Sequence, residues 1–129
     1  MRHLEQYKTN RVGSASKPQI VTMLFQEVGR RLEMALASLE AKSHDWRGHL
    51  HHVREILIEL RMALDFDAAP DLCKSLAALY DWAGAELLAA GRDEAEPRIQ
   101  NVVRVNETLL DAWTEALHRV NEPSASIGP

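Results

Sequence analysis

Apolar residues recur at every third or fourth position in four stretches of the chain that follow Ser16. This spacing is that of one face of an α-helix, and the alternation typical of a half-buried strand is not sustained anywhere. The first stretch predicts a helix over about residues 17–41, capped by Ser16, with Pro18 in its first turn. Its apolar stripe consists of Ile20, Leu24, Val28, Leu32, Ala35 and Leu39.

Three further helices follow the same logic. Ser43 or Asp45 can cap the second helix, which stops before Pro70, and the third helix ends at Gly91. Pro97 belongs in the first turn of the fourth helix, because a proline in a helix interior clashes with the preceding turn. The apolar stripe of the second helix is Leu50, Val53, Leu57, Leu60 and Leu64. That of the third helix is Leu72, Leu76, Leu79, Ala83 and Leu87, and that of the fourth helix is Ile99, Val103, Asn106, Leu110, Trp113 and Leu117.

Four amphipathic helices joined by short connections predict an all-α fold, an antiparallel up-down four-helix bundle. The bundle spans residues 16–121 in this interpretation. An N-terminal arm or short helix, residues 1–15, precedes it. Residues 122–129 form a tail rich in Ser, Gly and Pro, for which disorder is expected.

Several apolar residues lie off these stripes when positions are sorted by helical angle, at about 100° per residue. They are Met23 and Met34 on the first helix, Ile58 and Met62 on the second, and Tyr80 and Trp82 on the third. Each alone could be a scattered exposed residue or a filler at the edge of the core. Together they indicate a second apolar face that suits an amphipathic partner helix.

Composition narrows the functional classes. The 129 residues suit one domain, and the formal net charge of −4 disfavours a nucleic-acid partner, which selects a basic face. No apolar run approaches the roughly 18 residues of a membrane span, and the first residues lack the apolar segment of a signal peptide. Cys73 is the only cysteine, so no internal disulfide can form. These features favour the cytoplasm and no membrane insertion.

Histidines crowd the start of the second helix, where His49 and His52 share a face and could bind a metal. No Cys-x-x-Cys pair accompanies them, so a solvated polar helix start is the favoured interpretation and no metal or other cofactor is expected. Asp65, Asp67 and Asp71 span a helix end and the next helix start, where aspartates serve as caps. No nucleophile motif or phosphate-binding glycine loop occurs, and an enzyme is not expected.

Four groups of residues resemble a known family. They are Tyr7 and Val12 ahead of Ser14-Ala15-Ser16; Ile20 to Phe25; Glu59-Leu60, Leu64-Asp65, Leu76 and Leu79-Tyr80-Asp81-Trp82; and Ile99, Val102, Leu109-Leu110 and Ala112-Trp113. In this order and spacing the chain resembles the flagellar export chaperone family, FliS. It departs from the family pattern at Lys17, which separates Ser16 from Pro18, and at Trp82-Ala83, where the family has Tyr-Met.

The resemblance implies a cytoplasmic chaperone that binds the disordered C-terminal segment of flagellin. Such a chaperone prevents premature polymerisation and aids delivery to the flagellar type III export gate. In the family the N-terminal arm covers part of the client groove, which makes Tyr7 and Val12 candidates for a self-cap; the alternative is a frayed arm. A related bundle that binds another flagellar or regulatory protein stays an alternative, and a homodimer through the groove stays open.

Overall fold

Four helices joined by three short connections make up residues 17–120, the part of the chain that the computed structural model describes. They are α2 (Lys17–Glu40), α3 (Trp46–Met62), α4 (Pro70–Ala90) and α5 (Ala95–Val120). Each predicted helix is present, and the all-α fold is confirmed. The candidate residues Tyr7 and Val12, with the rest of the arm and the whole of the predicted tail, lie outside the described residues.

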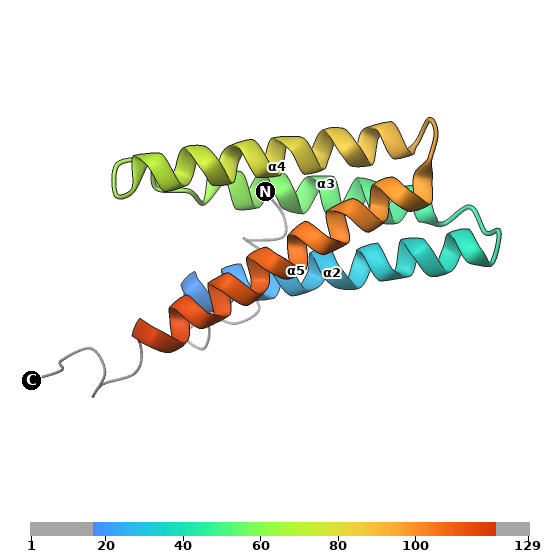
Figure 1. Ribbon diagram of the computed structural model, residues 1–129. Helices are drawn as coiled ribbons and strands as arrows, with labels where there is room; N and C mark the ends of the chain where they lie inside the picture. Colours follow the sequence, from blue (N-terminus) through green and yellow to red (C-terminus); the bar gives the residue numbers. More distant parts are fainter. Residues whose placement is uncertain (1–16, 121–129) are drawn as a thin grey trace, which may run out of the picture.

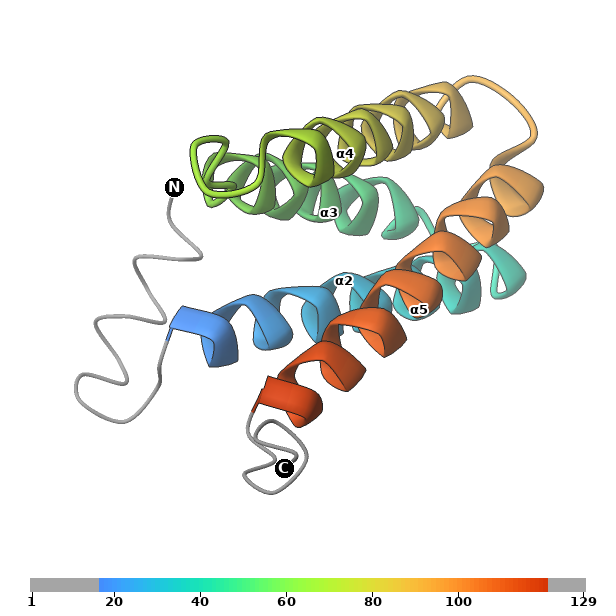
Figure 2. The ribbon, with the colours of Figure 1, turned by 60° about the vertical axis from the view of Figure 1, so that its left-hand side comes forward.

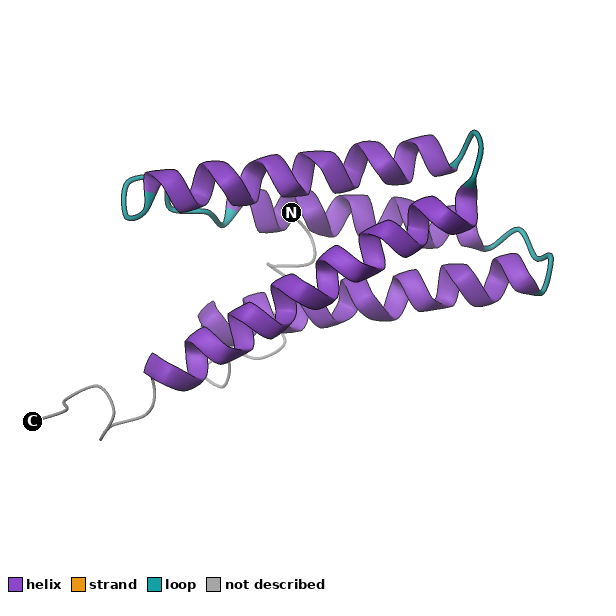
Figure 3. Cartoon of the chain, in the orientation of Figure 1, coloured by secondary structure: helices purple, strands orange, loops and turns teal. Residues whose placement is uncertain are grey.

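The helices form a closed ring in which each one packs against two neighbours. Helix α2 contacts α3 and α5, and α4 contacts the same two helices. Consecutive helices run in opposite directions, and only short loops separate them (Figures 1 and 3). This is the up-down arrangement expected for short connections.

The two halves of the bundle are not parallel to each other. Helices α3 and α4 form one pair and α2 and α5 form the other. The pairs converge at the end that carries loops 41–45 and 91–94 and diverge at the end that carries loop 63–69 (Figure 2). The bundle therefore has a closed end and an open end.

The core fills the closed end and the middle. Its most deeply buried side chains come from all four helices: Leu24, Leu32, Leu50, Ile56, Leu87 and Ile99. Burying a side chain of this size stabilises the fold by about 1.5–3 kcal/mol. The amide of Asn106 on α5 donates a hydrogen bond of 3.2 Å to the Phe25 carbonyl on α2. An added Cβ at Gly29 would lie 3.4 Å from the nitrogen of this amide, at the limit of ordinary van der Waals contact.

A residue with left-handed backbone conformation, a lysine and not a glycine, follows the end of α2. Lys42 has a φ of 59°, and its amide bonds to the Leu39 carbonyl at 3.0 Å. The Ser43 amide bonds to the Ser38 carbonyl at 2.9 Å, which completes a Schellman motif. Asp45 holds the N-cap position of α3 as predicted, but its side chain makes no capping hydrogen bond.

The predicted stripe of α4 is partly wrong. Leu72, expected in the core, is 59% exposed, whereas Tyr80, expected off the stripe, is only 5% exposed. The small residues Cys73 and Ala77 are buried together with Tyr80. Helix α4 carries leucine and alanine around most of its circumference, so its sequence alone leaves the rotation about its axis undetermined.

Candidate functional site

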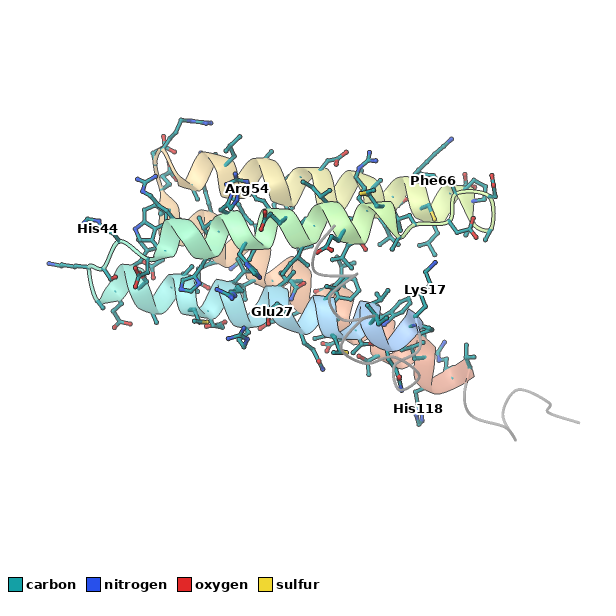
Figure 4. The ribbon with its side chains drawn as sticks, turned by 180° about the vertical axis from the view of Figure 1, so that it is seen from behind. Lys17, Glu27, His44, Arg54, Phe66 and His118 are labelled. Atoms are coloured by element: carbon teal, nitrogen blue, oxygen red, sulfur yellow. The ribbon has the colours of Figure 1, made fainter. Side chains whose placement is uncertain are left out.

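An apolar cleft of about 440 Å³ lies between the two helix pairs at the open end of the bundle. We call it the mouth cleft. Its walls are Leu60, Ala63, Leu64, Asp65, Ala68, Ala69, Leu72, Cys73, Leu76 and Tyr80 on the α3–α4 side, and Val21, Phe25, Leu109, Ala112, Trp113 and Ala116 on the α2–α5 side. Figure 4 places Phe66, Lys17 and His118 at this end and His44 at the other.

Asp65, the charged residue in this lining, is committed to the turn between α3 and α4. Its carboxylate accepts hydrogen bonds from the amides of Asp67 at 3.1 Å and Ala68 at 3.2 Å. Its carbonyl accepts a hydrogen bond from the Cys73 thiol at 3.2 Å. Asp65 therefore stabilises the turn and caps neither helix, because the N-cap position of α4 is Ala69. The cleft itself presents mainly apolar surface.

An aromatic pair forms the floor of the cleft on the α2–α5 side. The rings of Phe25 and Trp113 lie 6.4 Å apart between centroids at an angle of 54°. The Trp113 indole donates a hydrogen bond of 2.8 Å to the Thr22 hydroxyl, which in turn donates to the Pro18 carbonyl at 3.1 Å. The tryptophan predicted for the core is thus half-buried, and one side of it faces the cleft.

Tyr80 forms the deep end of the opposite wall. Its burial, with a smaller contribution from the nearby Cys73, raises the pKa of Tyr80 to about 12. Like an ordinary tyrosine, the phenol is neutral at physiological pH, and it adds no charge to the cleft. The placement of Tyr80 on an exposed flank was wrong, yet it is one of the candidates that line this cleft.

The other described candidates lie elsewhere. Ile58 and Met62 are 57% and 61% exposed, and Met34 and Trp82 are each 38% exposed. Met23 is half-buried. Of the candidates within residues 17–120, Tyr80 alone belongs to the mouth cleft, so the structure does not gather the set into one face.

Sequence reasoning missed most of the cleft because its walls are the inner stripes of the helices. Helices α2 and α5 have 24 and 26 residues and α3 has 17, so the longer stripes continue past the end of α3. Alanines replace bulky residues there. The sequence did carry a signal for the cleft, namely alanines at the open end where a closed core would need larger residues. They are Ala63, Ala68, Ala69, Ala112 and Ala116.

The histidines take part in polar contacts between α2 and α3. The Glu27 carboxylate lies 3.7 Å from His52 Nε2 and 2.7 Å from the Arg30 guanidinium. Burial would raise the pKa of Glu27, but hydrogen bonds from Arg30 and Arg31 outweigh it and lower the pKa below its usual range. His49 Nδ1 lies 3.2 Å from the guanidinium of Arg31. Within residues 17–120, no group of three or more side chains is arranged to hold a metal ion.

A membrane span would require a long, apolar helix, and none of the helices within residues 17–120 meets both conditions.

Comparison with known proteins identifies the family. The family model described as "Flagellar protein FliS" matches residues 1–120. The chain is 32% identical over 108 residues to the "Flagellar secretion chaperone FliS" of Escherichia coli (strain K12), an alignment that covers 82% of this chain and 79% of that protein. It is 29% identical over 112 residues to the protein of the same name from Campylobacter jejuni subsp. jejuni serotype O:6 (strain 81116 / NCTC 11828), covering 84% and 86%. On the fold, the cleft and these matches, the chain belongs to the FliS family of flagellar secretion chaperones.

Proposed function

We propose that this protein is a cytoplasmic export chaperone that holds the disordered C-terminal segment of flagellin in the mouth cleft. Binding would prevent premature polymerisation and aid delivery to the flagellar type III export gate. The names of the two relatives support the class of function. The apolar cleft at the open end is the observation that supports the mode of binding.

The chemistry of the cleft suits a segment that folds as it binds. A disordered amphipathic chain loses conformational entropy when it becomes ordered, and burial of its apolar face offsets this loss. The rim supplies further apolar surface, because Leu72 is 59% exposed and Phe66 in the adjoining turn is 40% exposed. At about 440 Å³ the cleft accepts a few large side chains, so the rest of the client would lie along its edges.

The N-terminal arm is proposed to compete with the client for the cleft. Helix α2 begins with Lys17 at the open end, so residues 1–16 are attached beside the cleft (Figure 4). Tyr7 and Val12 would supply the apolar contacts that a client replaces. A variant with Tyr7→Ser and Val12→Ser should then bind the client more tightly than the unchanged chain does.

Calorimetry with the full chain tests the proposal. A synthetic peptide of the flagellin C-terminal segment should form a stoichiometric complex, and circular dichroism should show more helix than the two components alone. Absence of heat and of added helix would contradict the proposal. Binding of a different flagellar or regulatory protein at the same cleft would instead favour the related adaptor function.

Self-association is a separate outcome of the same proposal. A second copy could cover the exposed apolar rim of the mouth cleft in the absence of client. Sedimentation velocity would then show a dimer that the flagellin peptide dissociates. A dimer that persists in the presence of saturating peptide would place the contact between copies on another surface.

A further inference from the structure

A second hollow, of about 260 Å³, lies on the outer side of the α3–α4 pair near the closed end. Residues of α3, α4 and the first positions after α4 line it, and residues of α2 and α5 do not. Three arginines, Arg47, Arg54 and Arg92, surround an apolar floor. We call this site the basic hollow; its floor consists of Trp46, Leu50, Leu87, Leu88 and Gly91.

The three arginines differ from most arginines in the described helices, which pair with carboxylates. The ion pairs are Arg30 and Arg31 with Glu27, Arg61 with Asp81, Arg98 with Glu86 and Asp93, and Arg119 with Glu115. Within residues 17–120, no carboxylate forms an ion pair with Arg47, Arg54 or Arg92. A cluster of uncompensated positive charge on a chain of net charge −4 favours an acidic ligand.

One of these guanidinium groups is held in place. Arg47 donates a hydrogen bond of 2.8 Å to the Gly91 carbonyl and lies 4.4 Å from the centroid of the Trp46 ring. Arg54 contacts His51 Nδ1 at 3.4 Å. Because Arg47 is already ordered, a ligand that it contacts loses less free energy to the immobilisation of this side chain.

The apolar surface next to these charges is exposed and continues along the helix pair. Leu88 beside the basic hollow is 54% exposed. Arg54 also lines an adjacent hollow of about 260 Å³, which contains Ile58, 57% exposed, and ends at the Arg61–Asp81 ion pair. Positive charge and apolar surface therefore lie together along the outer groove between α3 and α4.

We propose that the basic hollow binds an acidic amphipathic segment of a partner protein. Arginine favours carboxylates because its planar guanidinium donates two parallel hydrogen bonds. The apolar face of the segment would cover Leu88 and Trp46. The basic hollow and the mouth cleft share no lining residue, so the protein can hold this partner and its client together.

A second copy of the chain fits the basic hollow less well. The complementary acidic surface, which contains Glu33, Glu40 and Glu96, lies between α2 and α5. That pair forms the opposite side of the ring. Contacts between the two surfaces would leave one of each free at the ends, so they would build an open chain of copies and not a closed dimer.

The test uses ¹⁵N-labelled full chain and a synthetic peptide that carries Leu at positions i, i+3, i+4 and i+7 of a helix and Glu on the opposite face. A control peptide carries Lys in place of every Glu. The glutamate peptide should shift the Trp46 indole resonance and the amides of Leu88 and Arg92, and the lysine peptide should not. Added salt should weaken the complex, because the arginines are near the surface.

Substitutions locate the contact. The double variant Arg54→Gln, Arg92→Gln should weaken binding of the glutamate peptide by about tenfold or more, because two charge-assisted contacts are lost. The matched double variant Arg104→Gln, Arg119→Gln should bind as the unchanged chain does. Unchanged resonances of Trp113 and other core residues would show that both variants are folded.

Three results would overturn the proposal. One is equal binding of both peptides, or binding of neither. Another is a footprint centred on the mouth cleft. The third is self-association of the chain, seen by sedimentation, that the double variant Arg54→Gln, Arg92→Gln abolishes. A second copy of the chain would then be the occupant of the basic hollow. Because the flagellin peptide is proposed to bind in the mouth cleft, loss of acidic-peptide binding at the basic hollow leaves the proposed client function untouched.

Discussion

The indole N–H of Trp113 on α5 donates a hydrogen bond of 2.8 Å to the hydroxyl of Thr22 on α2. This contact joins two residues that are 91 positions apart, of which Trp113 lines the mouth cleft. It satisfies a polar group that would otherwise face apolar surface. The hydrogen bond therefore fixes the aromatic floor at the end of the bundle where the helix pairs diverge.

Thr22→Val should destabilise the protein by about 1–2 kcal/mol, because it leaves the half-buried indole N–H without its acceptor. Thr108→Val is the matched control. Both hydroxyls donate to the carbonyl four residues earlier, at 3.1 Å, but Thr108 is exposed and accepts no indole. Urea unfolding measures both free energies. Equal losses for the two variants would show that the indole contact contributes nothing.

Leu72→Ala should weaken binding of the flagellin peptide by about fivefold to twentyfold, since the exposed part of this side chain would be buried by the client. Leu88→Ala is the control, because Leu88 is a similarly exposed leucine of α4 that lies outside the mouth cleft. Calorimetry should show unchanged affinity for the control. Both variants should keep the free energy of unfolding within about 0.5 kcal/mol, as expected for exposed positions. A larger effect of Leu88→Ala on affinity would place the client on the outer face of α4.

Tyr80 should remain un-ionised until about pH 12, because burial raises its pKa from the usual value of 10.0. The folded state then holds a proton that the unfolded chain releases near pH 10. This contribution to stability is complete below about pH 10 and declines as the pH rises from about 10 to 12.

Unfolding experiments between pH 8 and pH 12 should therefore show a steeper loss of stability for the unchanged chain than for Tyr80→Phe. Ultraviolet titration of the phenolate checks the pKa directly. An ordinary pKa near 10 for Tyr80 would mean that its hydroxyl reaches solvent, and it would contradict the burial of this residue in the cleft wall.

Lys42→Gly should stabilise the protein by about 0.5–1 kcal/mol, because the left-handed conformation at this position strains any residue with a Cβ. Lys74→Gly, on an exposed position inside α4, should instead destabilise it by about 1 kcal/mol. Thermal unfolding of the two variants compares the signs. Destabilisation by Lys42→Gly would show that its side chain makes a contact worth more than the strain.

The pattern of the sequence predicted α2 and α5 well because their polar and apolar faces differ strongly. The α2 stripe residues Ile20, Leu24, Val28, Leu32 and Ala35 are buried as expected. Asn106 within the α5 stripe is buried too, and its amide bonds to the Phe25 carbonyl. In α4 the contrast is weak. Leu72 and Tyr80 exchanged their expected places because leucine and alanine surround this helix and only packing against α3 and α5 sets its rotation.

The mouth cleft could not be predicted from helical angles. Its walls include Leu60, Leu64 and Leu76, which a closed bundle would bury in its core. Whether the helices that carry these residues stay in contact or diverge at one end depends on the angle between the two helix pairs. That angle is set by side-chain packing along the whole length of the helices. The off-stripe residues Met62 and Trp82 are exposed as expected, but they lie outside the cleft.

The three tryptophans allow one measurement to test where the client binds. Trp113 lines the mouth cleft, Trp46 lines the basic hollow, and Trp82 lies exposed on α4. Each indole N–H gives its own resonance in a ¹⁵N correlation spectrum of the full chain titrated with the flagellin C-terminal peptide. If the peptide binds in the mouth cleft, the Trp113 resonance shifts and those of Trp46 and Trp82 stay in place. A shift of Trp82 or Trp46 with Trp113 unchanged would contradict binding in the mouth cleft.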